Sequence, residues 1–254
     1  MKQGLVSSTI GTSGVVFAHM DDIQIDKFGR VHTFCHAVPG KWHVMGVTQG
    51  AGLSLQWFRN QFCQPEMEQA KLENIDPYIL MDKAADEVPA GANGVIYLPY
   101  LMGERTPHLD PDARGVFFGL SAKHNRFDML RSVMEGVSYS LLDCLNIIAD
   151  MGVRATEVNA GGGGGKSKLW RQMQADMFGC NMVTNNSTEG GALGVALLAG
   201  VGTGAYSSVE EACAATINVV DNTSPISENV ETYKKYYPIY KDIYLSLKEQ
   251  FKRL

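Results

Sequence analysis

Hydrophobic and polar residues in the first fifty positions form short runs that are typical of β-strands. The first two runs are joined by Gly-Thr-Ser-Gly at residues 11–14, a turn sequence that suits a hairpin. We name this segment the first turn. The pattern predicts an antiparallel meander at the start of the chain. Its strands are expected at residues 5–10, 15–18, 32–37 and 42–47.

Helical spacing dominates from residue 49 onward, and the helices alternate with short β-prone runs. The clearest helix covers residues 127–151, where apolar residues recur at three- and four-residue steps and form one stripe. Asn125, with Asp128 three residues later, is suited to cap its start, and Gly152 is suited to end it. Within this helix the default interpretation of Glu135 is an exposed carboxylate.

The remaining pattern completes an α/β domain. Further helices are expected at residues 49–62, 77–85, 167–178, 189–199, 208–214 and 230–252, the last with a kink or break at Pro238. Further strands are expected at residues 95–98, 115–119, 156–159, 182–184 and 216–220. A meander followed by helix–strand alternation predicts one mixed sheet with helices on both faces. The small residues of the 189–199 helix predict very close packing against a neighbour.

Five consecutive glycines at residues 161–165, here named the glycine loop, follow one predicted strand and precede a helix that starts near Ser167. Glycine lets a ligand approach the backbone closely, and the first amides of a helix attract anions. The loop therefore predicts a phosphate or nucleotide site, although a flexible linker or structural turn is the alternative. The first turn adds the hydroxyls of Thr12 and Ser13. In a mixed sheet both segments could reach one ligand from two sides.

Composition is that of an ordinary globular protein, with 254 residues, 45% hydrophobic and 19% charged. The net charge of −5 and the lack of a basic cluster argue against nucleic acid or an anionic membrane as the main partner. No apolar run approaches the roughly 18 residues that a membrane span needs, and the N-terminus has no signal-peptide pattern. We therefore expect a cytoplasmic protein.

Three further features, the cysteines, a pair of histidines and one long loop, are each explained more simply by a structural role than by a binding or catalytic one. The five cysteines are scattered, which favours reduced thiols that serve as small core residues. His32 and His36 share one face of a predicted strand, but strand or surface histidines are favoured over a metal site. Residues 100–114 form a loop without periodicity, and loops of this length are usually functional or disordered. A structural salt-bridge network among its charges is slightly favoured over direct ligand contact.

Five segments, taken together and in order, resemble the C-terminal, nucleotide-binding domain of the FGGY carbohydrate kinases. They are Gly-Thr-Ser-Gly at 11–14, Gln-Gly-Ala-Gly-Leu-Ser-Leu-Gln-Trp-Phe at 49–58, Gly-Glu-Arg-Thr-Pro at 103–107 with Asp-Pro-Asp-Ala-Arg-Gly at 110–115, Gly-Val-Phe-Phe-Gly-Leu at 115–120 continuing to Met-Glu-Gly at 134–136, and Gly-Gly-Gly-Gly-Lys-Ser-Lys-Leu-Trp-Arg-Gln-Met at 162–173. The resemblance covers nearly the whole chain, and within the family it is strongest to members that phosphorylate D-xylulose.

This resemblance implies an actin-like, ribonuclease-H-like fold that binds ATP with Mg²⁺ and serves phosphoryl transfer to a hydroxyl of an open-chain ketopentose. The implied nucleotide contacts are Gly11 and Thr12 at the β- and γ-phosphates with Ser13 in the same turn, Gly52 and Gln56 near the phosphates and ribose, and Gly163, Gly164 and Ser167 at the α-phosphate and adenosine. The role of Gln56 is the least specific, because its position varies among sugar kinases.

The family's general base is an aspartate that lies shortly before the first turn. Only ten residues precede Gly11, and none of them is Asp. We therefore expect residues 1–254 to be a single C-terminal nucleotide-binding domain that lacks its sugar-binding N-terminal domain. No catalytic residue and no Mg²⁺ ligand is assigned to the chain. Its expected partners are that missing domain and a small sugar, and a homodimer is compatible with the sequence. Alone, the chain is expected to bind ATP or ADP weakly and to phosphorylate nothing, because transfer needs both reactants and a placed base.

Alternative functions stay open to different degrees. An actin-like activator of an acyl-CoA dehydratase would need cluster-ligating cysteines, which this chain does not have. A dinucleotide-binding dehydrogenase would carry its glycine motif after the first strand, whereas the glycine loop comes late. A non-catalytic nucleotide-binding or interaction module remains an alternative. So does a kinase for another sugar, such as ribulose, gluconate or fuculose, because the specificity pocket would lie mostly outside this chain.

Overall fold

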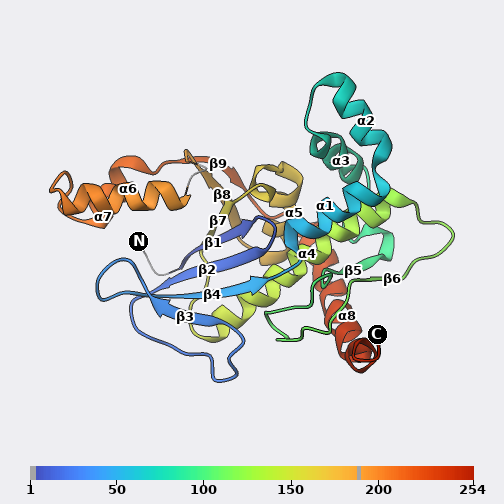
Figure 1. Ribbon diagram of the computed structural model, residues 1–254, viewed down its shortest axis with the longest axis horizontal. Helices are drawn as coiled ribbons and strands as arrows, with labels where there is room; N and C mark the ends of the chain where they lie inside the picture. Colours follow the sequence, from blue (N-terminus) through green and yellow to red (C-terminus); the bar gives the residue numbers. More distant parts are fainter. Residues whose placement is uncertain (1–3, 188–189) are drawn as a thin grey trace.

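A seven-stranded mixed sheet forms the centre of the computed structural model, which describes residues 4–187 and 190–254 (Figure 1). The strand order is β3-β4-β2-β1-β7-β8-β9. The strands are β1 (Leu5–Ile10), β2 (Gly14–Met20), β3 (His32–Cys35), β4 (Trp42–Thr48), β7 (Glu157–Gly161), β8 (Asn181–Asn185) and β9 (Val219–Thr223). A separate two-stranded ribbon pairs β5 (Ile96–Leu98) with β6 (Val116–Phe118).

The sheet combines an antiparallel half with a parallel centre, which confirms the predicted mixed α/β fold. Strands β1, β2, β4 and β3 pair antiparallel, whereas β1, β7 and β8 are parallel. One detail differs from a simple meander, because β4 lies between β2 and β3. The long connection that follows β2 lets the chain pass to the outer edge before it returns.

Helices pack against this sheet on β2 and β4 and on β8 and β9. The helices are α1 (Ala51–Phe62), α2 (Gln64–Glu73), α3 (Pro77–Asp86), α4 (Arg126–Asp150), α5 (Lys168–Phe178), α6 (Gly190–Gly202), α7 (Val209–Thr216) and α8 (Ser227–Phe251), with the short 3-10 turns η1 (Ala92–Gly94) and η2 (Gly164–Lys166). Helix α2 was not expected from the sequence, because it buries little apolar surface. The described helices include none that is long and apolar enough to cross a membrane.

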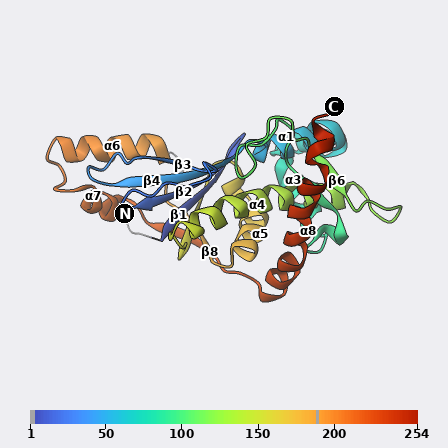
Figure 2. The same cartoon turned by 90° about the horizontal axis from the view of Figure 1, so that it is seen from below.

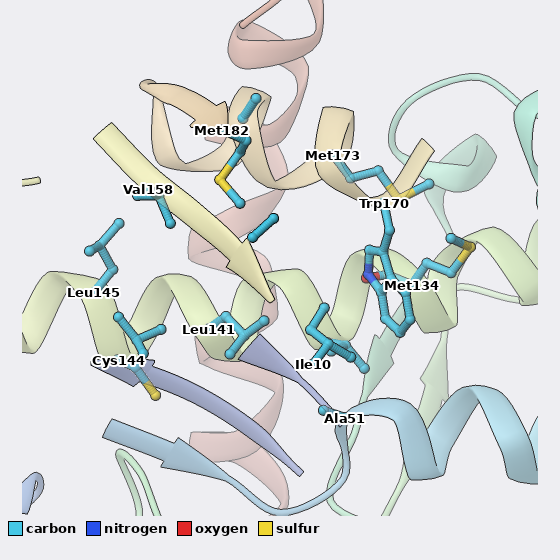
Figure 3. Packing of buried hydrophobic residues seen from close by; sticks show 14 of the residues in the cluster. Ile10, Ala51, Met134, Leu141, Cys144, Leu145, Val158, Trp170, Met173 and Met182 are labelled. Atoms are coloured by element: carbon cyan, nitrogen blue, oxygen red, sulfur yellow. The ribbon is translucent and has the colours of Figure 1, made fainter. Parts of the chain in front are cut away.

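The core lies between the sheet and helices α4 and α5, which pack against each other. Figure 3 shows Leu141, Cys144 and Leu145 of α4 facing the strands, with Val158 and Met182 nearby. Helix α4 comes very close to β4 at Gly46, where an added Cβ would lie only 2.6 Å from the Cβ atom of Cys144.

Both predicted ends of α4 are confirmed. The Asn125 side chain accepts a hydrogen bond from Phe127 N at 2.7 Å, and Asp128 accepts one from Asn125 N at 2.7 Å. Gly152 follows the helix with a φ of +89°. These local interactions fix where the longest core helix begins and ends.

The prediction for Glu135 was wrong, because its side chain is only 3% exposed. It accepts hydrogen bonds from Arg131 Nε at 2.8 Å, from Gly91 N and from the hydroxyl of Tyr233, each at 3.0 Å. Helix α8 and the segment before η1 cover this side of α4. Figure 2 shows α8 at the opposite end of the molecule from α6 and α7.

Two other helical predictions need correction. Of the kink or break expected at Pro238, the break is wrong, because helix α8 continues through this residue. The close packing predicted for the small-residue helix is not found along its first half: an added Cβ at Gly191 or Gly194 would meet nothing within 4 Å, and Val195 is 69% exposed. Farther along α6, Leu197 is buried and an added Cβ at Gly200 would lie 3.1 Å from the ring of Tyr206. Glu189, where that helix was expected to begin, lies outside the described residues.

The cysteines only partly fit their expected place in the core. All five are free thiols; Cys63 and Cys144 are buried, Cys180 and Cys213 are half-buried, and Cys35 is exposed. Burial raises the pKa of Cys63 to about 11, so this thiol stays protonated at neutral pH.

Candidate functional site

The first turn and the glycine loop meet because their strands are adjacent and parallel. Strand β1 pairs with β7 in a register that sets Thr9 opposite Gly161. Segments that follow the carboxyl ends of adjacent parallel strands emerge at the same edge of a sheet. Two turns separated by about 150 residues in the sequence therefore border one cavity.

Helix α1 is fixed directly against the first turn. Gly52 N donates to the carbonyl oxygen of Gly11 at 2.9 Å, and Leu53 N donates to that of Thr12 at 3.0 Å. A Cβ added at Gly52 would lie 2.2 Å from the Gly11 oxygen. Glycine is therefore needed at position 52 to bring the helix onto the turn, and two amides of α1 are used for this contact.

The glycine loop packs tightly on the end of β1. Gly162 has a φ of +72°, and an added Cβ would lie 2.4 Å from the carbonyl oxygen of Ile10. At Gly164 an added Cβ would lie 2.6 Å from the Ile10 side chain. At Gly163, by contrast, it would meet nothing within 4 Å. The loop thus needs glycine on its inner side and leaves open space at Gly163.

The cavity between these segments has a volume of about 570 Å³, which is within the usual range for small-molecule sites. Seven of the eight predicted nucleotide contacts lie in its wall, namely Gly11, Thr12, Gly52, Gln56, Gly163, Gly164 and Ser167. Ser13 lies in the same turn but is not among the lining residues. The sequence therefore identified residues that the fold brings together.

Sequence reasoning missed one wall of the cavity. Helix α3 contributes Asp76, Tyr78, Ile79 and Asp82, and other additional lining residues include Lys166 and Trp170. The helix itself was predicted, but no local signal connected it with the glycine loop more than 80 residues later. Lys166, which lies outside α3, could have been found from the sequence, because it directly follows the glycines.

Ser167 has structural partners besides any ligand. Its hydroxyl oxygen accepts a hydrogen bond from Trp170 N at 3.0 Å and so caps α5. Burial raises the pKa of Asp82, which lines the same cavity, and the nearby Ser167 hydroxyl opposes this shift. Ser167 therefore joins the glycine loop, α5 and α3 at one point of the cavity wall.

Arg171 binds the carbonyl oxygens at the end of the glycine loop. Its side chain is buried, and its Nη1 atom donates to the carbonyl oxygens of Gly165 at 2.8 Å and Lys166 at 3.2 Å. Its Nη2 atom pairs with Asp221 at 2.7 Å. The guanidinium thus ties the loop to β9, a role that the sequence did not indicate.

The 100–114 loop is held mainly by hydrogen bonds, and the expected salt-bridge network is not found among the described residues. Glu104 is 2% exposed and accepts from Thr48 Oγ1 at 2.6 Å, Gln49 N at 3.1 Å, Arg105 N at 2.6 Å and Ser140 Oγ at 3.3 Å. Burial nevertheless raises its pKa to about 7. Glu104 therefore fixes the loop to the junction of β4 and α1.

The described part of the chain contains no group of three or more His, Cys, Asp or Glu residues that could hold a metal ion. His32 stacks on Phe34, whereas His36 lies beyond β3 with its ring 5.4 Å from that of His19 and 5.9 Å from that of His43. The pair His32 and His36 therefore takes part in ring packing at the edge of the sheet.

The fold is that of an actin-like ATPase domain. The chain belongs to the FGGY family of carbohydrate kinases, whose C-terminal domain matches residues 6–203. It is 36% identical to the xylulose kinase of Bacillus subtilis over 98% of this chain. It is 35% identical to the gluconokinase of the same organism over 100% of this chain. It is similar in structure to a xylulose kinase from Lactobacillus acidophilus, with a TM-score of 0.88 at 27% identity over 99% of the chain.

These matches also show how much of each relative the chain covers. It spans about half the length of the curated relatives it matches, 48% of the xylulose kinase and 49% of the gluconokinase of Bacillus subtilis. The solved xylulose kinase from Lactobacillus acidophilus is likewise covered over 49% of its chain. The part of the family that this chain matches is its C-terminal domain.

Proposed function

We propose that this chain is the nucleotide-binding half of a kinase that transfers the γ-phosphate of ATP to a hydroxyl of a sugar. One observation carries the proposal: the first turn and the glycine loop follow adjacent parallel strands and line the same cavity. The backbone amides of the first turn and the glycine loop, together with the Lys166 ammonium, suit the phosphates of a nucleotide. ATP fits the residues present, because the cavity has a volume of about 570 Å³ and an added Cβ at Gly163 in its wall would meet nothing within 4 Å.

The residues have separate roles in this proposal. Gly11 and Thr12 would hold the β- and γ-phosphates, with Ser13 beside them. Gly163 and Gly164 would hold the α-phosphate. Mg²⁺, when bound with the nucleotide, would neutralise charge on the phosphates. Gln56 and Ser167 would contact the ribose and base.

The sugar and the general base would come from a second domain, which the longer relatives have room for. D-Xylulose is the substrate we propose first, with gluconate and ribulose as alternatives, since relatives named for xylulose and gluconate match this chain with similar identity. The chain alone then provides the nucleotide side of the reaction. We also propose that it works without nucleic acid or membrane, and that its natural partner is the sugar-binding domain.

The direct test is calorimetry of the isolated chain with ATP and ADP, with and without Mg²⁺. Binding with millimolar or tighter affinity supports the proposal, and no binding at millimolar ATP would favour a non-catalytic interaction module. A coupled assay of ADP release with D-xylulose should show no turnover by the isolated chain. Turnover should appear in the two-domain protein, and comparing D-xylulose, gluconate and ribulose there identifies the sugar.

A further inference from the structure

Helix α3 gives the cavity one wall whose charge does not suit phosphate. Asp76 and Asp82 line it, and both are carboxylates. The first turn, the glycine loop and Lys166 attract anions, whereas the carboxylates of Asp76 and Asp82 repel them. Under the proposed function, the phosphates therefore lie toward the glycines, and the α3 wall faces the uncharged part of the nucleotide.

The apolar lining of the cavity supports the same orientation. Tyr78 and Ile79 lie on α3 three to four residues before Asp82, so the three share one face of the helix. Leu55 and Trp170 also line the cavity. Apolar side chains, two of them aromatic, with one polar group at the edge suit the flat ring of a nucleobase.

Asp82 is the polar group that this pocket offers at the edge of the base. Asp76 already accepts a hydrogen bond from Tyr78 N at 3.0 Å as the cap of α3, and it is exposed. Asp82 is half-buried and lines the cavity together with Ser167. A carboxylate can accept about four hydrogen bonds, so Asp82 retains capacity for a donor from the ligand.

Resting on the proposed function, we propose that Asp82 accepts a hydrogen bond from the exocyclic amino group of bound adenine and is the residue that selects the base. In a nucleotide the available donors are the ribose hydroxyls and the amino group of the base. The amino group is favoured because Asp82 shares its helix face with Tyr78 and Ile79. The Ser167 hydroxyl would hold the Asp82 carboxylate in position.

The test compares two nucleotides that differ only in this donor. Calorimetry on the full 254-residue chain would use ATP and purine riboside triphosphate, which is ATP without its amino group. We expect the native chain to bind ATP roughly tenfold more tightly than the analogue, the size of one hydrogen bond to a charged acceptor. Asp82→Ala should bind both nucleotides with the same affinity, near that of the native chain for the analogue.

The matched control is Asp86→Ala, which removes a carboxylate one turn later on the same helix. Asp86 is exposed and is not among the described residues that line the cavity. This variant should keep the tenfold preference for ATP. Thermal unfolding followed by circular dichroism checks that both variants keep the native fold, which is expected because alanine favours helix.

Three results would overturn the inference in distinguishable ways. If the native chain binds both nucleotides equally, or if Asp82→Ala keeps the preference, then Asp82 does not bind the amino group, while the proposed function stands. If Asp82→Ala loses affinity for ATP but not for 2′-deoxy-ATP, the carboxylate instead binds the ribose. If the native chain binds no nucleotide, the proposed function itself is wrong.

Discussion

Gly52→Ala is the substitution for which the structure gives the sharpest expectation. The added Cβ would lie 2.2 Å from the carbonyl oxygen of Gly11, and real Cβ contacts under 3.0 Å are essentially never seen. Helix α1 and the first turn must therefore separate by at least about 0.8 Å. Backbone atoms form this contact, so no side-chain rotation can relieve it.

The separation would break two hydrogen bonds. The bonds from Gly52 N to Gly11 O and from Leu53 N to Thr12 O measure 2.9 and 3.0 Å, and a shift of about 0.8 Å takes both beyond the usual limit. Each lost bond costs about 1 kcal/mol, and alanine returns up to about 1 kcal/mol through its helix propensity. We expect a net loss of about 1–2 kcal/mol in the free energy of unfolding.

Ligand binding should suffer more than stability, because the displaced turn carries the proposed phosphate contacts Gly11 and Thr12. We expect at least a tenfold loss in ATP affinity, measured by calorimetry alongside urea unfolding. Gly194→Ala is the matched control: it is the same substitution within a helix, but the added Cβ meets nothing within 4 Å. If Gly52→Ala matches this control in both stability and affinity, then the close approach of α1 to the turn does not shape the site.

Three further variants test the surroundings of the site. Glu104→Gln should change the pH dependence of stability: the folded pKa is raised from 4.5 to about 7, so the proton-linked stability is complete below pH 4.5 and is lost as pH rises through 7. Between pH 4.5 and 8, the free energy of unfolding of the native chain, measured with urea, should therefore fall by about 3 kcal/mol relative to that of Glu104→Gln. If the free energies of the two proteins instead change in parallel with pH, Glu104 titrates normally. Arg171→Lys should lose the bond to Gly165 O, lower stability by about 1–2 kcal/mol and weaken ADP binding in calorimetry; unchanged affinity would show that the loop keeps its shape without the guanidinium. Glu135→Leu leaves Arg131 buried without its partner and should cost about 3–5 kcal/mol in urea unfolding, whereas a loss below 1 kcal/mol would contradict the buried pair.

The sequence by itself determined the elements that depend on neighbours within a few residues. The capping box of Asn125 and Asp128 and the turn at Gly152 mark the ends of α4, because caps are local hydrogen bonds. Most strands and helices likewise follow from periodicity. Helix α2 was missed because its single buried residue, Ala70, leaves almost no apolar stripe to detect.

The two glycine segments were also recognisable locally, but their meeting depended on the sheet. Gly11 and Gly163 border one cavity only because β1 and β7 are adjacent and parallel. Strand order is a long-range property: β4 pairs with β2, and this pairing places the start of α1, with Gly52, against the first turn.

Tertiary structure alone decided the rest of the site and much of the polar core. The α3 wall with Asp82 reaches Ser167 from 85 positions away in the chain, and Arg171 reaches Asp221 from 50. Glu135 looked like a surface carboxylate because its own helix gives no sign that α8 will cover it. Whether a polar side chain is buried depends on which distant segment packs over it, and local sequence patterns carry no record of that contact.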